Sequence, residues 1–253
     1  MTWRKEMETT PQEIQSHLSK MSDEEIKAWM KDRTSTFQKI MTYYRCALME
    51  IETKFNVLDA EYSLQYDRNP VSSIHTRLKS PESILEKLNR RGLPVSLESI
   101  EQNLNDVAGV RVICAFPEDV YTLAQVLLSQ DDITLVEWKD YIKKPKPSGY
   151  RSLHLIVSVP IFLANQKKPM NVEIQLRTIA MDCWASLEHQ LRYKKERSFT
   201  DQMNEDLKLC AKLSAELDLR MDALRQSVVG EQYVPYESVL AKQIAFEADG
   251  NNE

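Results

Sequence analysis

The sequence predicts an α+β fold in which helices flank a mixed five-stranded sheet, with helical extensions at the N- and C-terminal ends. Three observations favour this class. Five short segments have the apolar–polar alternation or the β-rich composition of strands, and helical patterns separate the first three of them. The last three strand segments follow one another without a helix between them, which disfavours a doubly wound parallel sheet. Long segments with helical spacing lie on both sides of this block.

The N-terminal part of the chain is expected to be helical. Apolar residues recur at helical spacing in residues 23–30 and 37–66, with almost no Gly or Pro. The pair Asn69-Pro70 breaks this pattern, because a residue before proline disfavours the helical conformation. Residues 71–79 then have the character of a strand that carries Arg77 and Lys79 on one face. We therefore expect a helical extension over residues 1–69 and a catalytic domain that begins at residue 70.

A helix over residues 80–92 has the clearest boundaries in the chain. Ser80 can accept a hydrogen bond as the N-cap, Pro81 suits the first helical position, and Gly92 can end the helix. The pattern after this helix predicts a strand at 109–116, a helix at 117–129 and a strand at 133–141.

Two strand segments with unusual polar faces follow, at residues 149–157 and 171–178, after a loop at 142–148. One face of each is apolar, and the other has the residues Tyr150, Ser152 and His154 in the first segment and Asn171, Glu173, Gln175 and Arg177 in the second. An ordinary solvated face would carry scattered Lys, Glu and Thr. An aromatic ring, a histidine, a carboxylate, an amide and a guanidinium are the groups of a nucleotide-binding site.

The remaining segments complete the expected organisation. Residues 179–193 have a helical pattern that closes the catalytic domain at about residue 197, and a C-terminal helix is expected within 198–229. Residues 230–253 are acidic and weakly patterned, a composition typical of disordered segments.

Composition narrows the class of protein. The hydrophobic content of 42% is sufficient for a folded core, and no apolar run approaches the roughly 18 residues that cross a membrane. The start of the chain lacks the apolar segment of a signal peptide, so we expect a cytoplasmic protein. The cysteines are widely spaced, as is typical of reduced residues rather than of structural zinc or disulfides: Cys46, Cys114, Cys183 and Cys210. The net charge of −5 argues against a dedicated nucleic-acid binder.

Absent motifs restrict the chemistry further. The five glycines of the chain cannot form GxxxxGK[ST] or GxGxxG, and the four histidines form neither HExxH nor a His-Asp pair. A phosphate-binding site would therefore have to consist of Lys and Arg side chains, with carboxylates to hold Mg²⁺. Asp106 and Glu173 are the candidate magnesium ligands. With equal weight, Asp106 could cap a turn and Glu173 could pair with Arg177 or a lysine.

Tyr150 and His154 also have two interpretations. A strand tyrosine is usually a packing residue, and a single histidine is more often structural than catalytic. Tyr150 nevertheless follows a Lys- and Pro-rich loop and lies close to His154 in the sequence, an arrangement in which the ring can stack on a base.

Six motifs in order resemble the RelA/SpoT-type alarmone synthetases, from about residue 70 to residue 195. They are Arg77-Leu-Lys79, Ser83-Ile-Leu-Glu-Lys87, Asp106-Val-Ala-Gly-Val-Arg111, Ser148-Gly-Tyr-Arg-Ser-Leu-His154, Glu173-Ile-Gln-Leu-Arg-Thr178 and Trp184-Ala-Ser-Leu-Glu-His189. The resemblance implies a nucleotidyltransferase-like synthetase domain. The short chain without a His-Asp hydrolase domain is similar to a small, stand-alone synthetase, and members of this type imply a homotetramer.

The resemblance implies a Mg²⁺-dependent GTP pyrophosphokinase of the stringent response. Such an enzyme transfers the diphosphate of ATP to the ribose 3′-hydroxyl of GTP or GDP and yields AMP and (p)ppGpp. The implied catalytic residues and metal ligands are Asp106 and Glu173. The implied ATP-binding residues are Arg77, Lys79, Ser83, Lys87 and Arg111, with the two arginines on either side of adenine. The implied GTP- or GDP-binding residues are Lys144, Lys146, Tyr150, His154 and Gln175, with Tyr150 stacked on guanine.

The sequence departs from the family pattern at two places. Asp182 stands where some relatives carry Asn, and residues 73–76 differ from those of synthetases that their own product activates.

Two other functions are alternatives to alarmone synthesis. One is a non-catalytic regulator that binds guanine nucleotides or single-stranded RNA on the same fold, although the net charge gives RNA binding little support. The other is a nucleotidyltransferase that releases pyrophosphate.

Overall fold

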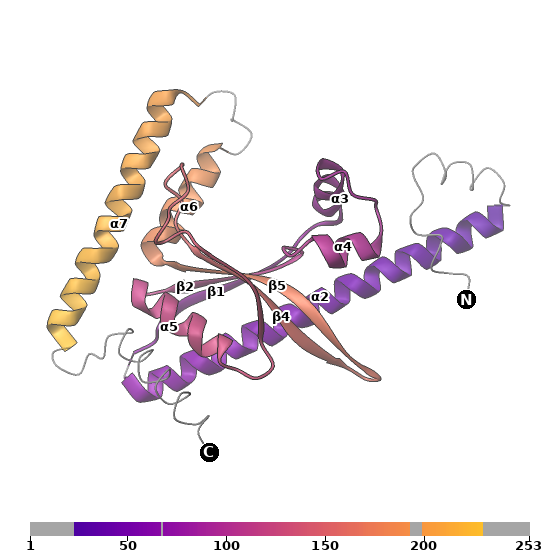
Figure 1. The fold of residues 1–253 in the computed structure, drawn as a ribbon, viewed down its shortest axis with the longest axis horizontal. Helices are drawn as coiled ribbons and strands as arrows, with labels where there is room; N and C mark the ends of the chain where they lie inside the picture. The colour runs from indigo at the N-terminus through magenta and orange to yellow at the C-terminus, as the bar shows by residue number, and fades with distance from the viewer. Residues whose placement is uncertain (1–22, 67, 193–198, 230–253) are drawn as a thin grey trace, which may run out of the picture.

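A computed structural model describes residues 23–66, 68–192 and 199–229 (Figure 1). Five strands form one sheet in the order β1-β2-β5-β4-β3. The strands are β1 (Val71–Leu78), β2 (Ala108–Cys114), β3 (Thr134–Asp140), β4 (Leu153–Leu163) and β5 (Gln166–Thr178). The helices are α2 (Asp23–Tyr66), α3 (Pro81–Arg90), α4 (Leu97–Asn103), α5 (Pro117–Leu128), α6 (Ile179–Arg192) and α7 (Asp201–Val229).

The sheet is mixed, which confirms the predicted α+β class. β2 pairs with β5 in parallel, and the other three neighbouring pairs are antiparallel. A parallel pair requires a long connection, and here the connection from β2 to β5 contains α5 and the two strands β3 and β4. Among the described helices, none combines the length and the apolar character that a membrane crossing requires.

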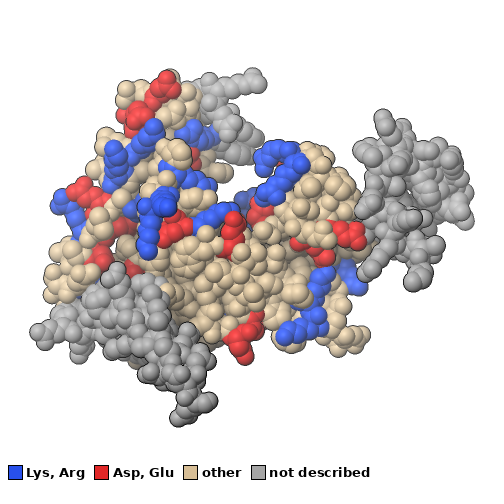
Figure 2. Space-filling model, in the orientation of Figure 1, with Lys and Arg blue, Asp and Glu red and all other residues tan. Residues whose placement is uncertain are grey.

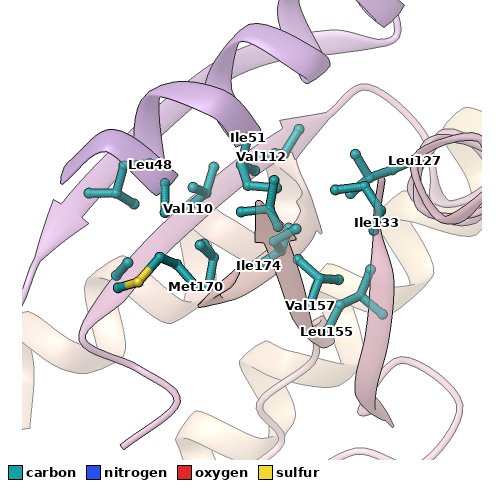
Figure 3. Close-up of a cluster of buried hydrophobic side chains, with 14 of the residues drawn as sticks. Leu48, Ile51, Val110, Val112, Leu127, Ile133, Leu155, Val157, Met170 and Ile174 are labelled. Carbon is teal, nitrogen blue, oxygen red and sulfur yellow. The ribbon is translucent and has the colours of Figure 1, made fainter. Parts of the chain in front are cut away.

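One face of the sheet forms the hydrophobic core with α2 and α5. Buried residues of α2 recur every three or four positions, as expected for one face of a helix, and they are Ile40, Tyr44, Ala47, Leu48, Ile51, Phe55 and Leu58. Figure 3 shows Leu48 and Ile51 above Val110 and Val112 of β2, with Ile174 of β5 beside them. Each of these side chains stabilises the fold by about 1.5–3 kcal/mol through removal from water.

The opposite face of the sheet is open between two groups of helices. The helices α6 and α7 lie at one side of the sheet, and α3 and α4 lie at the other (Figure 1). The space-filling view is hollowed between these two parts, and Lys and Arg side chains gather around the hollow (Figure 2). This face is the place where polar residues of the strands can meet a ligand.

The start of β4 differs from the prediction. Residues 149–152 were expected to begin the strand, but β4 begins at Leu153. Gly149 has a φ of 93°, which turns the chain just before the strand. Ser152 is fully buried and donates to the carbonyl of Leu176 at 3.1 Å, so it does not belong to the open polar face.

Other predicted elements agree with the structure in type, but several bounds differ. β4 continues to Leu163 rather than ending at residue 157, and β5 begins at Gln166 rather than at residue 171. The predicted helix at 80–92 is confirmed, because the Ser80 hydroxyl accepts from the amide of Ser83 and Gly92 ends the helix with a φ of 65°. Helix α4 was missed, and α2 is one continuous helix rather than two segments. Residues 193–198 and the acidic tail at 230–253 lie outside the described residues.

Helix α7 is held against α6 and the turn before β4 by polar contacts. The indole of Trp184 donates to the carbonyl of Leu207 at 3.0 Å, and the hydroxyl of Ser214 donates to the carbonyl of Ala180 at 2.9 Å. An ion pair joins Arg151 to Asp218, whose side chains are 12% and 6% exposed. α7 therefore fixes the segment that leads into β4.

Gly149→Ala is expected to destabilise the protein and to loosen α7. A Cβ at this position would lie 2.5 Å from the Cβ of Ala211, and the positive φ adds backbone strain. The expected loss in the free energy of unfolding is about 2–4 kcal/mol, measured by urea denaturation.

Gly92→Ala is the matched control, because Gly92 also has a positive φ but has nothing within 4 Å of an added Cβ. Gly92→Ala should lower the free energy of unfolding by about 1 kcal/mol, through backbone strain alone. Equal losses in the two variants would show that the approach of Gly149 to α7 does not matter for stability.

Candidate active site

Strand register places five of the predicted site residues in two rows across the open face. In one row, neighbouring strands pair the residues His75, Arg111, Gln175, His154 and Lys139 in turn. In the next row, they pair Arg77, Gly109, Glu173, Ile156 and Glu137. Since paired residues project to the same face, the candidate ATP residues of β1 and β2 lie directly beside the candidate acceptor residues of β5 and β4.

Asp106 lies just before β2 and is held by two lysines. The Nζ of Lys79 is 2.8 Å and the Nζ of Lys87 is 2.6 Å from the Oδ2 of Asp106. Burial alone would raise the pKa of Asp106, but the hydrogen bonds and charges of Lys79 and Lys87 outweigh burial and lower that pKa. Asp106 is therefore an ionised carboxylate at neutral pH, and its charge is compensated.

Glu173 is the second carboxylate of the open face. Its Oε1 lies 3.6 Å from the Nδ1 of His154, and its Oε2 accepts from the amide of Gln175 at 3.1 Å. Burial raises the pKa of Glu173, and the contacts with His154 and Gln175 lower it by more, while the charge of Asp106 opposes them. The charge of Asp106 is thus felt at Glu173, as expected for two carboxylates near one another.

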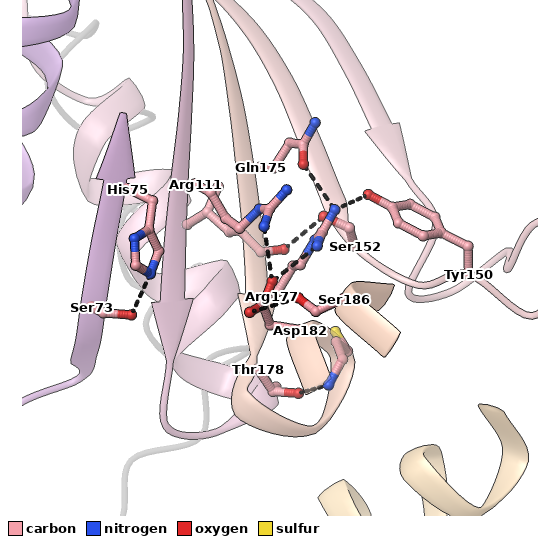
Figure 4. Close-up of polar contacts among 12 residues, drawn as sticks. Ser73, His75, Arg111, Tyr150, Ser152, Gln175, Arg177, Thr178, Asp182 and Ser186 are labelled. Atoms are coloured by element: carbon pink, nitrogen blue, oxygen red, sulfur yellow. Dashed lines mark hydrogen bonds and ion pairs between the residues drawn. The ribbon is translucent and has the colours of Figure 1, made fainter. Parts of the chain in front are cut away.

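A polar network extends from Glu173 to helix α6. The hydroxyl of Tyr150 lies 2.8 Å from the Nε2 of His154 and accepts from the Nη2 of Arg177 at 2.6 Å. The same nitrogen of Arg177 also donates to the Oε1 of Gln175 at 2.9 Å, and its Nη1 donates to the Oδ1 of Asp182 at 3.0 Å (Figure 4). Arg177 is only 4% exposed, so the network has a buried cation at its centre.

Tyr150 belongs to a group of rings and cations. The rings of Tyr141 and His154 contact it edge-on, with centroids 6.3 and 5.8 Å away. The Nζ of Lys146 lies 5.0 Å from the centre of the Tyr150 ring, and the guanidinium carbon of Arg177 lies 5.1 Å from it. Lys146 is exposed, whereas Arg177 is buried, so Lys146 is the group that a stacking base can displace.

Arg77 and Arg111 lie on neighbouring strands and share the open face. Arg77 pairs with Gly109, two residues before Arg111, and it is exposed. Burial and the neighbouring charge of Arg177 lower the pKa of Arg111, while Asp182, at 3.4 Å from its Nη1, opposes this shift. A pair of guanidiniums in this diagonal arrangement can hold a flat ring between them.

Two predicted residues are not in contact with the rest of the site. Ser83 lies in the first turn of α3, where its backbone amide and its hydroxyl both contact the hydroxyl of Ser80. Lys144 is exposed in the loop after β3, and only its backbone amide has a described hydrogen bond, to the carbonyl of Asp140. Their predicted roles in phosphate binding stay predictions.

The residues present fit a magnesium ion. The Oδ1 of Asp106 is buried and has no hydrogen-bond partner in the structure, so it is available to a cation. Within the described part of the chain, no group of three or more His, Cys, Asp or Glu residues could form a closed metal site. Mg²⁺ prefers one or two carboxylates together with water and phosphate oxygens, so two carboxylates suit Mg²⁺ rather than structural zinc.

Arg177 and Asp182 are central to the observed network but were not among the predicted site residues. Arg177 had a sequence signal, since it lies in the same alternation as Glu173 and Gln175. The only sequence signal for Asp182 was its departure from the family pattern. Its contacts depend on how α6 turns back under β5, which no local pattern encodes.

Known proteins are similar to this chain over most of its length. A model of the region found in RelA / SpoT proteins matches residues 76–198. The chain is 40% identical to GTP pyrophosphokinase YwaC of Bacillus subtilis (strain 168) over 205 residues. This alignment covers 81% of this chain and 96% of YwaC. The chain is 34% identical over 192 residues to GTP pyrophosphokinase YjbM of the same organism, which covers 76% and 90%.

Solved structures of small alarmone synthetases are also similar to this chain. The crystal structure of small alarmone synthetase 2 from Bacillus subtilis has a TM-score of 0.69 and 40% identity, over 76% of this chain and 98% of the other. The structure of small alarmone synthetase 1 from Bacillus subtilis bound to its product pppGpp has a TM-score of 0.70 and 34% identity, over 76% and 98%.

Asp106→Asn is expected to make the free energy of unfolding less dependent on pH in the acidic range. The lowered pKa of Asp106 means that the folded protein binds fewer protons than the unfolded chain in this range. The contribution is complete above the ordinary pKa of about 4 and is lost as pH falls through the lowered value. The rise in the free energy of unfolding between about pH 3 and about pH 5 should be smaller in the variant, measured by urea denaturation.

Glu86→Gln provides the control, because Glu86 is exposed on α3 and has no described ion pair. It should keep the pH profile of the wild type. An unchanged profile in Asp106→Asn would contradict the tight ion pairing of Asp106.

Proposed function

The chain belongs to the RelA/SpoT family, and from this premise we propose that it is a GTP pyrophosphokinase of the stringent response. It transfers the diphosphate of ATP to the ribose 3′-hydroxyl of GTP or GDP and yields AMP and (p)ppGpp. One observation supports this function above all others. Two ionised carboxylates, Asp106 and Glu173, lie between a cationic group of residues on one side and an aromatic group on the other.

The cationic side suits ATP. Arg77 and Arg111 have planar guanidiniums that can hold adenine between them, a role that lysine cannot fill. Lys79 and Lys87 already hold a carboxylate oxygen, and phosphate oxygens can replace it as their partner. Ser83 lies between these lysines in the sequence, near the start of α3, and completes the proposed phosphate contacts.

The aromatic side suits the guanine nucleotide. The Tyr150 ring stacks on guanine when Lys146 moves from the ring toward the 5′-phosphates, with Lys144 as a second cation. His154 and Gln175 both contact Glu173, so they can position the acceptor ribose next to that carboxylate. The acceptor would then lie across β4 and β5.

The proposed reaction is an in-line attack on the β-phosphorus of ATP. A bond forms between the 3′-oxygen of the acceptor and this phosphorus, and the bond from the phosphorus to the oxygen shared with the α-phosphate breaks. AMP leaves with that oxygen, and Glu173 orients the 3′-hydroxyl and accepts its proton. Most of the acceleration would come from position and charge rather than from covalent chemistry.

Asp106 and Glu173 are the residues that would hold magnesium. When bound, the ion would neutralise charge on the transferred diphosphate. The lowered pKa values of both carboxyls keep them in the ionised form that the ion requires. Asp106 would exchange its lysine partners for the ion as the lysines turn to phosphate.

Assembly, location and the range of activity are part of the same proposal. Helix α7 has large apolar side chains exposed, among them Leu209, Leu213, Leu217 and Leu224, which supports burial in an oligomer. We propose a homotetramer in the cytoplasm, and light scattering on the purified chain tests the number of subunits. We propose no alarmone hydrolysis, since the sequence has no His-Asp pair.

A product assay tests the proposed reaction. Purified protein with ATP, GTP and Mg²⁺ should yield AMP and pppGpp, resolved by anion exchange, and removal of Mg²⁺ with a chelator should stop the reaction. Release of pyrophosphate in place of AMP would indicate a nucleotidyltransferase. Binding of GTP without any turnover would indicate a non-catalytic regulator.

Glu173→Gln is expected to lower kcat by about 10²-fold or more, because the amide neither accepts the proton nor binds the ion well. Binding of α,β-methylene-ATP, measured by calorimetry, should be partly retained. The control is Glu137→Gln, which lies in the same row of the sheet but is exposed and paired with Lys139 at 2.7 Å. Turnover near that of the wild type in Glu173→Gln would refute the role given to Glu173.

A further inference from the structure

Asp182 joins the two proposed nucleotide positions through a pair of arginines. Its Oδ1 lies 3.0 Å from the Nη1 of Arg177 and 3.4 Å from the Nη1 of Arg111 (Figure 4). Arg111 belongs to the proposed adenine position on β2. Arg177 belongs to β5 and donates to the hydroxyl of Tyr150, the proposed guanine platform. One carboxylate oxygen therefore contacts a residue of each substrate position.

The two arginines depend on this one carboxylate for charge balance. Among the described residues, the only ion pairs of Arg111 and of Arg177 are with Asp182. Arg177 is almost fully buried, and each guanidinium has a buried Nε without a hydrogen-bond partner in the structure. Their positive charges repel one another, and this repulsion adds to burial in lowering the pKa of Arg111. Asp182 is thus shared between two groups that compete for it.

Contacts beyond Arg177 continue to the reacting carboxylate. The Nη2 of Arg177 donates to the Tyr150 hydroxyl at 2.6 Å, and this hydroxyl lies 2.8 Å from the Nε2 of His154. The other ring nitrogen of His154 lies 3.6 Å from Glu173. A firmer Arg177 would hold the tyrosine and the histidine in one arrangement, ready for the acceptor.

We propose that Asp182 is a positioning residue that couples the binding of the two nucleotides. When Arg111 turns from Asp182 to adenine, Asp182 pairs with Arg177 alone, and the stronger pair fixes Tyr150 and His154 for the guanine nucleotide. ATP then raises the affinity for GDP or GTP, and by linkage the guanine nucleotide raises the affinity for ATP by the same factor. This inference rests on the proposed function, which assigns adenine to Arg111 and guanine to Tyr150.

Calorimetry with unreactive nucleotides tests the coupling. The dissociation constant of GDP is measured with Mg²⁺ alone and again with saturating α,β-methylene-ATP, in which the bond that must break is replaced by a methylene bridge. In the wild type, the analogue should tighten GDP binding by at least about fivefold. The ratio of the two constants is the readout, because a residue with a merely structural role would weaken both constants and leave their ratio unchanged.

Asp182→Asn should bring this ratio to about one, since the amide keeps the shape of the side chain but carries no charge. Ser186→Ala is the matched control. Its hydroxyl is 3.5 Å from the Oδ2 of Asp182, so its loss removes a neighbour of Asp182 without a change of charge, and the wild-type ratio should persist. Asp182→Glu should restore at least part of the ratio.

Tyr150→Phe keeps the experiment decisive where Asp182→Asn does not fold. It retains the ring for stacking but removes the hydroxyl that joins Arg177 to His154, and it should lose the coupling while it still binds GDP. Independent binding of the two nucleotides in the wild type, or a full ratio in folded Asp182→Asn, would overturn the inference and leave the proposed function intact. Failure of the wild type to bind either nucleotide would overturn the proposed function and the inference with it.

Discussion

The parallel pairing of β2 with β5 determines where the polar side chains of the site lie. This pairing sets Gly109 beside Glu173 and Arg111 beside Gln175. A shift by one residue would turn Glu173, Gln175 and Arg177 into the core and bring apolar residues to the open face. The buried Val110, Val112 and Ile174 under α2 oppose such a shift, so the core fixes the register and the register builds the site.

Charge compensation is the second requirement, because the site gathers many ionised groups away from bulk water. Asp106 is paired with Lys79 and Lys87, and Arg111 and Arg177 share the single negative charge of Asp182. Buried pairs of this kind contribute little net stability, yet removal of one member leaves a costly unpaired charge. Such clusters suit a binding site, because each has two cations for one carboxylate, and one cation can turn to a phosphate or an adenine ring while the other stays paired.

Local signals in the sequence predicted the elements whose boundaries depend on neighbouring residues. The helix that starts at Ser80-Pro81 and ends before Gly92 follows from capping chemistry, and the alternation in residues 171–178 placed Glu173 and Gln175 on one face. The start of β4 was wrong, because the turn at Gly149 follows from a close approach to Ala211 of α7, about 60 residues later. The role of Asp182 was missed for a similar reason, since its partners lie on two strands and its own position depends on the packing of α6.

The two halves of the site differ in the same way: one is built from neighbouring residues and the other from segments far apart in the sequence. Its cationic half comes from residues 77–111, a continuous stretch in which short turns join β1, α3, α4 and β2. Its aromatic half combines the loop before β4, the end of β5 and α6, and the ion pair of Arg151 with Asp218 ties this half to α7. A change in α7 can therefore reach Tyr150 through the chain from Arg151 while Lys79, Lys87 and Asp106 keep their contacts. The acceptor half is the part of the site whose geometry depends on the whole fold.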